Sequence, residues 1–122
     1  MKVPKDSTKI DSVGLITLEG LGTWYNYNVP RITANGEKFN PNSLTCAFYI
    51  NSNEKRKYLN KFVRVTSKDT SFIIKVVDNG KFSDKKYKHL NHIIDFTPRV
   101  FHLLGGNLNQ GVINVKVELM ND

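Results

Sequence analysis

The sequence predicts a mainly β protein, a small β-barrel of about six or seven short strands with one short helix near the C-terminus. Three observations predict this fold. Apolar residues alternate with polar ones or form runs of strand length, most clearly at 62–66 and 111–119. Segments rich in Asn, Gly and Pro separate these runs, and only one segment carries the start and stop signals of a helix. The 122 residues suffice for one domain, and we expect a mobile polar arm at 1–12 and the barrel at 13–122.

Seven segments have the length and pattern of strands, and two of them fall in a region that glycines interrupt. The expected strands are residues 13–18, 21–25, 44–50, 62–66, 71–77, 93–96 and 111–119. Gly20 and Gly22 are expected to loosen the join between the first two. The Asn-, Pro- and Gly-rich stretch 26–42 predicts a long loop, in which the pair Asn35-Gly36 suits a tight turn with positive φ.

The second half of the chain carries the remaining turn and the helix. Asp78-Asn79-Gly80 predicts a turn that ends the strand at 71–77. The helix follows Thr97, a good N-cap, with Pro98 at its first position and Gly105 as its stop signal. We therefore expect one helix between 97 and 105.

The charge of the chain favours an anionic partner. Lys and Arg number 18 against 11 acidic residues, which gives a formal net charge of +7. Such a balance suits nucleic acid, an anionic membrane face or an anionic cell-wall polymer, although a solvated lysine-rich surface explains it equally well. Basic loops that also hold a tyrosine occur at 55–58 and 81–88. Nucleic-acid binding is not expected, because no RNA-binding sheet signature or recognition helix is visible.

Several other classes of site are excluded by residue type and spacing. The single cysteine, Cys46, lies in an apolar run and is expected to be a buried, inert thiol. The three histidines, His89, His92 and His102, have no zinc spacing and are expected on the surface or in loops. We find no phosphate-binding glycine loop, no nucleophile elbow and no apolar run long enough to span a bilayer, and we expect no cofactor and no metal. The start of the chain lacks the apolar core of a secretory signal, so either the protein leaves the cytosol by another route or the sequence is trimmed.

Three acidic residues remain as candidates for chemistry. Glu37 follows the Gly36 turn, Asp78 ends a strand, and Asp95 precedes the helix. If strand ends bring them together at the mouth of a barrel, a raised pKa would let one of them protonate a glycosidic oxygen. The alternative is structural: Asp78 caps a turn and Asp95 supports the helix start, and the residue types alone favour this alternative.

Seven motifs in a fixed order resemble a known family. They are Gly22-Thr23-Trp24-Tyr25, Thr33-Ala34-Asn35-Gly36-Glu37, Leu44-Thr45-Cys46-Ala47-Phe48, Val63-Arg64-Val65-Thr66, Asp78-Asn79-Gly80-Lys81-Phe82, Ile93-Ile94-Asp95-Phe96-Thr97 and the alternating strand at 112–119. This series is similar to that of the rare lipoprotein A family of septal lytic transglycosylases, whose domain is a six-stranded double-psi β-barrel that expansins share. The resemblance extends over residues 20–119.

The resemblance implies a function and a set of site residues. It implies cleavage of the bond between MurNAc and GlcNAc in peptidoglycan glycan strands, with formation of a 1,6-anhydro end. Asp78 would be the general acid and base, and Glu37 and Asp95 would position or tune it. Trp24, Tyr25 and Tyr27 would form a platform for sugar rings, with Thr33 and Asn35 as further substrate contacts.

Two departures from the family pattern keep a second reading open. The family histidine is Phe48 here, and the Arg and Pro of the aspartate turn are Asn79 and Lys81. The alternative is therefore an inactive wall-binding or structural module, for example a phage tail or virion component that contacts other virion or envelope proteins. Either reading predicts a location in the cell envelope, the periplasm or a virion.

Overall fold

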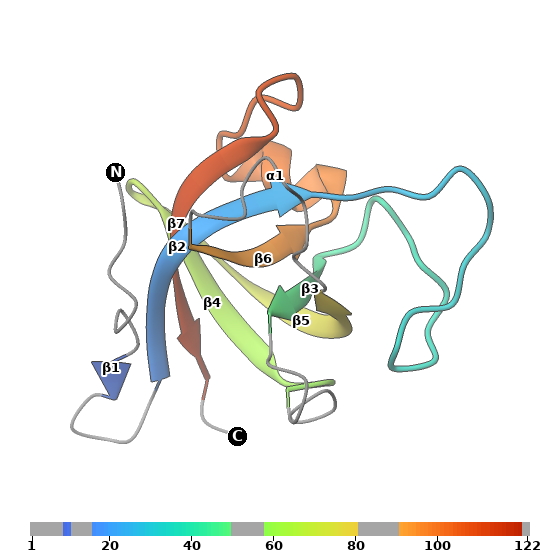
Figure 1. Cartoon of the computed structure of the whole chain (residues 1–122), viewed down its shortest axis with the longest axis horizontal. Helices are drawn as coiled ribbons and strands as arrows, with labels where there is room; N and C mark the ends of the chain where they lie inside the picture. The colour runs from blue at the N-terminus through green and yellow to red at the C-terminus, as the bar shows by residue number, and fades with distance from the viewer. Residues whose placement is uncertain (1–8, 11–15, 50–57, 81–90, 121–122) are drawn as a thin grey trace.

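Six strands close into a mixed barrel in the computed structural model, which describes residues 9–10, 16–49, 58–80 and 91–120. The elements are β1 (Lys9–Ile10), β2 (Ile16–Trp24), β3 (Thr45–Tyr49), β4 (Phe62–Ser67), β5 (Thr70–Gly80), β6 (His92–Phe96), α1 (Pro98–Leu103) and β7 (Val112–Leu119). Around the barrel the order is β2, β6, β3, β5, β4, β7, and β7 pairs with β2 to close it (Figure 1). The β2–β6 and β3–β5 pairs are parallel and the others antiparallel. The predicted mainly β barrel with one short helix is confirmed.

Strand β2 is continuous, which corrects the expectation that glycines interrupt it. It runs through Gly20 and Gly22 and pairs with β7 from Thr17 to Thr23. These glycines permit close packing instead: a Cβ at Gly20 would lie 2.3 Å from the Asn91 carbonyl oxygen, and one at Gly22 would lie 2.4 Å from the Phe96 ring. Their missing side chains let the parallel strand β6 approach β2.

Strand β5 extends through the predicted turn at 78–80, which is a second correction. The ladder with β3 continues to the pairs Phe48↔Asn79 and Tyr49↔Gly80. The register shifts between Cys46 and Ala47, so that Val77 is an extra residue in β5. This bulge lets Val76 and Val77 both be buried and turns Asp78 away from the core.

The helix has the predicted signals. The Thr97 hydroxyl accepts a hydrogen bond from the Val100 N–H, Pro98 occupies the first helical position, and Gly105 has φ +87°. The same hydroxyl donates to the Ser43 carbonyl at 2.7 Å, and Thr97 is fully buried. Thr97 therefore ties the helix start to the chain that leads into β3.

Aliphatic and aromatic side chains from the six barrel strands and α1 fill the interior. The largest fully buried ones are Phe96, Phe101, Ile74 and Ile94. Strand β4 buries alternate residues, as its period-two pattern predicts. Of the expected arm at 1–12, only Lys9 and Ile10 lie within the described residues, where they pair with β2, so this domain boundary stays a prediction. The basic residues expected at 55–57 and 81–88, with His89, lie outside the described residues.

Candidate functional site

Two of the three candidate acids lie in one row across neighbouring strands. Thr23 of β2 pairs with Asp95 of β6, Asp95 pairs with Ala47 of β3, and Ala47 pairs with Asp78 of β5. With strands spaced about 4.8 Å apart, the Cα atoms of Asp78 and Asp95 are separated by about 10 Å. The small methyl group of Ala47 lies between them, so the row leaves space above its centre.

A bulge precedes each aspartate. In β6 the register against β2 shifts between Leu21 and Gly22, so Ile93 is the extra residue, as Val77 is in β5. Each bulge changes which face of the strand the following side chains occupy. Both aspartates consequently leave the hydrophobic interior, although Val77, Ile94 and Phe96 beside them are buried.

An open cleft of about 550 Å³ contains this row. Its lining includes both aspartates, Ala47, Tyr25, Tyr27, Arg31 and Thr33. The cleft is thus lined by two acidic side chains, two tyrosine rings and the cationic Arg31. This composition suits a polar ligand with apolar ring faces, such as a saccharide.

Asp78 is held by the backbone around it. Its Oδ1 accepts hydrogen bonds from the Ala34 and Asn79 N–H groups, each at 3.1 Å. The Asn35 N–H donates to the Val77 carbonyl at 3.0 Å, which fastens the turn at 33–37 to the same strand. The turn that contains Asn35 and Gly36 therefore packs directly against Asp78. Gly36 has the predicted positive φ, at +90°.

Asp95 is held by side chains instead. Its Oδ1 accepts a hydrogen bond from the Thr23 hydroxyl and lies 3.1 Å from His92 Nε2. The Thr23 Oγ1 lies 2.8 Å from the same His92 nitrogen. The expectation of a surface or loop histidine is wrong for His92, which begins β6 and whose side chain is only 7% exposed.

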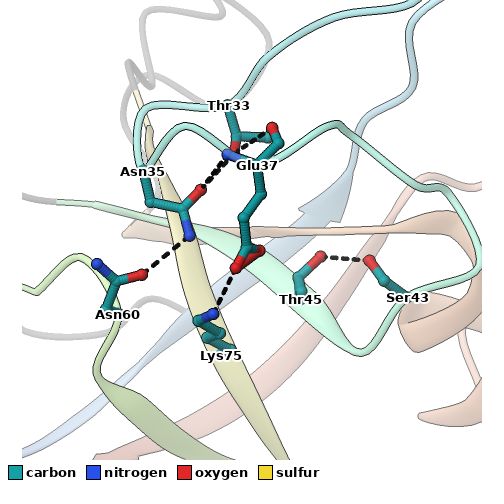
Figure 2. Close-up of polar contacts among 7 residues, drawn as sticks. All are labelled: Thr33, Asn35, Glu37, Ser43, Thr45, Asn60 and Lys75. Atoms are coloured by element: carbon teal, nitrogen blue, oxygen red, sulfur yellow. Dashed lines mark hydrogen bonds and ion pairs between the residues drawn. The ribbon is translucent and has the colours of Figure 1, made fainter.

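Glu37 lies outside this cleft. Its carboxylate forms an ion pair with Lys75 at 2.5 Å (Figure 2). Glu37 lines a separate pocket of about 220 Å³ with Thr33, Phe39 and Ser43. The hydrogen bond from Lys75 is the main cause that lowers the pKa of Glu37. Its side chain is 45% exposed, so the ion pair is a surface one.

Thr33 and Asn35 build the turn. The Thr33 hydroxyl contacts the Asn35 side-chain oxygen at 2.6 Å, and that oxygen also accepts from the Glu37 N–H at 3.1 Å. The Asn35 amide donates to Asn60 at 2.9 Å (Figure 2). Thr33 lines the cleft, whereas Asn35 is not among its lining residues.

The predicted aromatic platform divides in two. Tyr25, Tyr27 and Phe39 form a cluster with ring centroids 5.0–5.6 Å apart, and the Arg31 guanidinium lies 4.6 Å from the Tyr27 centroid. Trp24 instead packs against the core and donates from Nε1 to the Leu108 carbonyl at 3.1 Å. Only the tyrosines line the cleft.

The Tyr25 hydroxyl is buried and has no hydrogen-bond partner among the described residues. Burial is the main cause that raises the pKa of Tyr25, and the nearby Asp78 raises it further. The phenol therefore stays neutral at physiological pH.

Phe48, at the position of the family histidine, belongs to the core. It is 3% exposed and its ring lies 5.3 Å from that of Tyr58. Cys46 is fully buried, and burial raises the pKa of its thiol. Among the residues that the structure describes, no group of three His, Cys, Asp or Glu side chains could hold a metal ion, and no helix is long and apolar enough to cross a membrane.

Comparisons with known proteins agree on one family. A family model described as lytic transglycolase matches residues 17–117. The chain is 34% identical to the endolytic peptidoglycan transglycosylase RlpA of Rickettsia felis, with 98% of this chain and 49% of that protein covered. It is 36% identical to the protein of the same name from Rickettsia prowazekii, with 85% and 30% covered. The chain thus spans at most about half the length of these relatives.

Solved structures with the same fold are more distant in sequence. A papain inhibitor from Streptomyces has a TM-score of 0.64 at 19% identity, over 86% of this chain and 94% of that one. An expansin from Clavibacter michiganensis has a TM-score of 0.59 at 18% identity, over 87% and 51%. A point mutant of that expansin in complex with cellohexaose has a TM-score of 0.60 at 17% identity, over 87% and 51%. At these identities the likeness concerns the fold alone.

Thr23, Arg31, Ala47 and His92 are among the members of the site that sequence reasoning missed. Thr23 and Ala47 stand inside motifs of the sequence, but nothing in the motifs indicates that both pair with Asp95. His92 lies three residues before Asp95, a spacing that puts two side chains on opposite faces of a regular strand. Only the bulge at Ile93 puts them on the same face, and a bulge has no reliable local signal.

Proposed function

The chain belongs to the rare lipoprotein A-like family of lytic transglycolases, and from that membership we propose that it cleaves the glycan strand of bacterial peptidoglycan. The proposed reaction is lytic transglycosylation of the bond between MurNAc and GlcNAc. One observation carries the proposal beyond family membership: Asp78 and Asp95 flank Ala47 in one row, and this row lines an open cleft together with Tyr25 and Tyr27.

Asp78 is proposed as the group that moves the proton. In its protonated form it donates to the glycosidic oxygen as the bond from that oxygen to C1 of MurNAc breaks. The resulting carboxylate then takes the proton of the MurNAc 6-hydroxyl as O6 bonds to C1. The products are a 1,6-anhydro-MurNAc end and a GlcNAc end with a free 4-hydroxyl, and Asp78 regains its proton, so no water is consumed.

The other predicted residues are proposed in supporting roles. Tyr25 and Tyr27 would pack against sugar rings, and Thr33 would contact hydroxyl groups at the cleft wall. Glu37, paired with Lys75, and Asn35 would stabilise the turn whose backbone holds Asp78. Trp24 would anchor the end of β2 through its bond to Leu108.

The net charge is consistent with this substrate. A chain with formal charge +7 is attracted to a wall that carries peptide carboxylates and polymer phosphates. We propose accordingly that the protein acts in the cell envelope.

A second candidate function, wall binding without catalysis, is favoured by Phe48. The family histidine is replaced by a phenylalanine that packs in the core, so no imidazole is available at that position to relay a proton. Such a protein would bind glycan through the same cleft and release no product.

Incubation of the protein with purified sacculi, followed by mass spectrometry of soluble fragments, tests the two candidates. Catalysis predicts 1,6-anhydro products that disappear in Asp78→Asn and persist in Asp69→Asn, a matched change at an exposed acid in the turn between β4 and β5. Retention on sacculi without anhydro products would reject catalysis and support binding. Absence of both would reject the two candidates together.

A further inference from the structure

Three side chains from two strands meet at one point beside the cleft. Thr23 Oγ1, His92 Nε2 and Asp95 Oδ1 form a closed triangle of polar contacts. Thr23 is 8% exposed, the His92 side chain 7% and the Asp95 side chain 21%. The triangle is thus mostly buried, and the carboxylate is its most accessible member.

The positions of the hydrogens follow from the donors available. The Thr23 hydroxyl has one proton and donates it to Asp95 Oδ1. Toward His92 the Thr23 oxygen can then only accept, and a carboxylate can only accept as well. His92 Nε2 must therefore carry a hydrogen, which it shares between Thr23 and Asp95.

This arrangement saturates one oxygen of Asp95. All contacts of the carboxylate with described residues fall on Oδ1, whereas Oδ2 has none. Two donors from different strands fix the plane of the carboxylate, because rotation about its terminal bond would break both contacts. Asp95 lines the cleft, so the fixed carboxylate is available to a ligand there.

We propose that Thr23 and His92 are positioning residues that hold Asp95 as a fixed negative charge opposite Asp78. The inference rests on the proposed function, in which Asp78 moves the proton. The 1,6-anhydro bridge forms on the same face of the sugar that the leaving oxygen departs from, so one carboxyl group can serve both transfers. The second carboxylate, across Ala47, then stabilises the positive charge that develops on the glycosyl ring as the bond to C1 breaks.

The role proposed for His92, orienting the carboxylate of Asp95, differs from the proton relay that a histidine at position 48 could provide. Phe48 lies in the core, whereas His92 contacts an acid of the cleft from the neighbouring strand β6. The imidazole orients a charge and moves no proton. Loss of the contact should therefore slow the reaction and leave glycan binding unchanged.

Paired variants at both positions test the inference. His92→Leu removes the hydrogen-bond donor, and His92→Gln retains a donor. Thr23→Val replaces the hydroxyl by a methyl group of nearly equal volume, and Thr23→Ser retains the hydroxyl. We expect kcat to fall about 10–100-fold in the Leu and Val variants, the cost of a carboxylate displaced by about 1 Å or less. We expect KM to stay within about twofold in all four, and kcat of the Gln and Ser variants to stay within about threefold of the wild type.

Two outcomes of the kinetics overturn the inference. Leu and Val variants that fold and turn over at the wild-type rate would show that the triangle has no catalytic role. Equal losses of kcat in the variants that retain the hydrogen-bonding group (Gln, Ser) and in those that remove it (Leu, Val) would show that these positions matter for packing alone. If His92→Leu fails to fold, the Thr23 pair decides between these outcomes, because Thr23→Val preserves shape.

A readout independent of turnover separates this inference from the proposed function. Long-range ¹H–¹⁵N spectra of the imidazole rings, assigned with His89→Gln and His102→Gln, should show His92 protonated at Nε2 and altered by Asp95→Asn. A ring protonated at Nδ1 alone in a protein that releases anhydro products overturns the inference and leaves the proposed function standing. A wild-type protein that releases no anhydro product overturns the proposed function, and with it the catalytic role assigned to the triangle, even when the ring is protonated at Nε2.

Discussion

A substitution of Ala47 tests the proposed site most specifically, because its methyl group lies at the centre of the row, between the two aspartates. Ala47 is 4% exposed, lines the cleft and pairs with both Asp78 and Asp95. Ala47→Leu adds three carbon atoms that reach about 2.5 Å beyond Cβ into this space. A saccharide seated between the carboxylates would have to shift by more than about 1 Å, and a shift of that size costs about 100-fold in rate. The expected loss is thus at least about 2.7 kcal/mol of transition-state stabilisation.

The assay compares the rate of anhydro-product release from sacculi for Ala47→Leu, the smaller Ala47→Val and a control with the same added leucine at Ser71. Ser71 is an exposed residue of β5, where a leucine meets solvent. We expect an order Ser71→Leu, Ala47→Val, Ala47→Leu of decreasing activity, with folding verified by circular dichroism. A folded Ala47→Leu variant with wild-type activity would refute the placement of the glycan between the two aspartates.

Three further predictions concern stability. Thr97→Ala removes the helix cap and leaves the half-buried Ser43 carbonyl without its donor. The free energy of unfolding should therefore fall by about 2–3 kcal/mol, against about 1 kcal/mol for Thr97→Ser, and equal losses in denaturant titrations would contradict this. Gly22→Ala puts a Cβ 2.4 Å from the fully buried Phe96 ring and should cost about 1–3 kcal/mol; an unchanged melting temperature would show that β6 can move away. Glu37→Gln should cost less than about 1 kcal/mol at pH 7, because the pair with Lys75 is exposed. The pKa of Glu37 is lowered in the folded state, so the contribution of its ion pair to stability is present above the ordinary pKa of 4.5. That contribution is lost as the pH falls through the pKa of Glu37 in the folded protein. A stability difference between Glu37→Gln and the wild type that persists well below pH 4.5 would be inconsistent with the ion pair.

Local signals in the sequence determined several elements of this protein, although β2 and β5 continue where glycines and a turn signal predicted a break. Alternation identified β4 and β7, a threonine, a proline and a glycine marked the ends of α1, and Asn35-Gly36 marked the turn with positive φ. These features depend on neighbours a few residues apart, so they can be read along the chain. The order of the motifs likewise sufficed to identify the family.

The arrangement of the site was decided by pairing between distant strands. The sequence does not distinguish among the three candidate acids Glu37, Asp78 and Asp95. In the structure only the two aspartates line the same cleft, and Glu37 forms an ion pair with Lys75. The bulges at Val77 and Ile93 arise where a parallel partner strand imposes its register, and each moves the following side chains to the other face. A shift of one residue in register thus decides whether an aspartate points into the core or lines the cleft. That change is fixed by contacts some tens of residues apart, so only the tertiary structure could decide it.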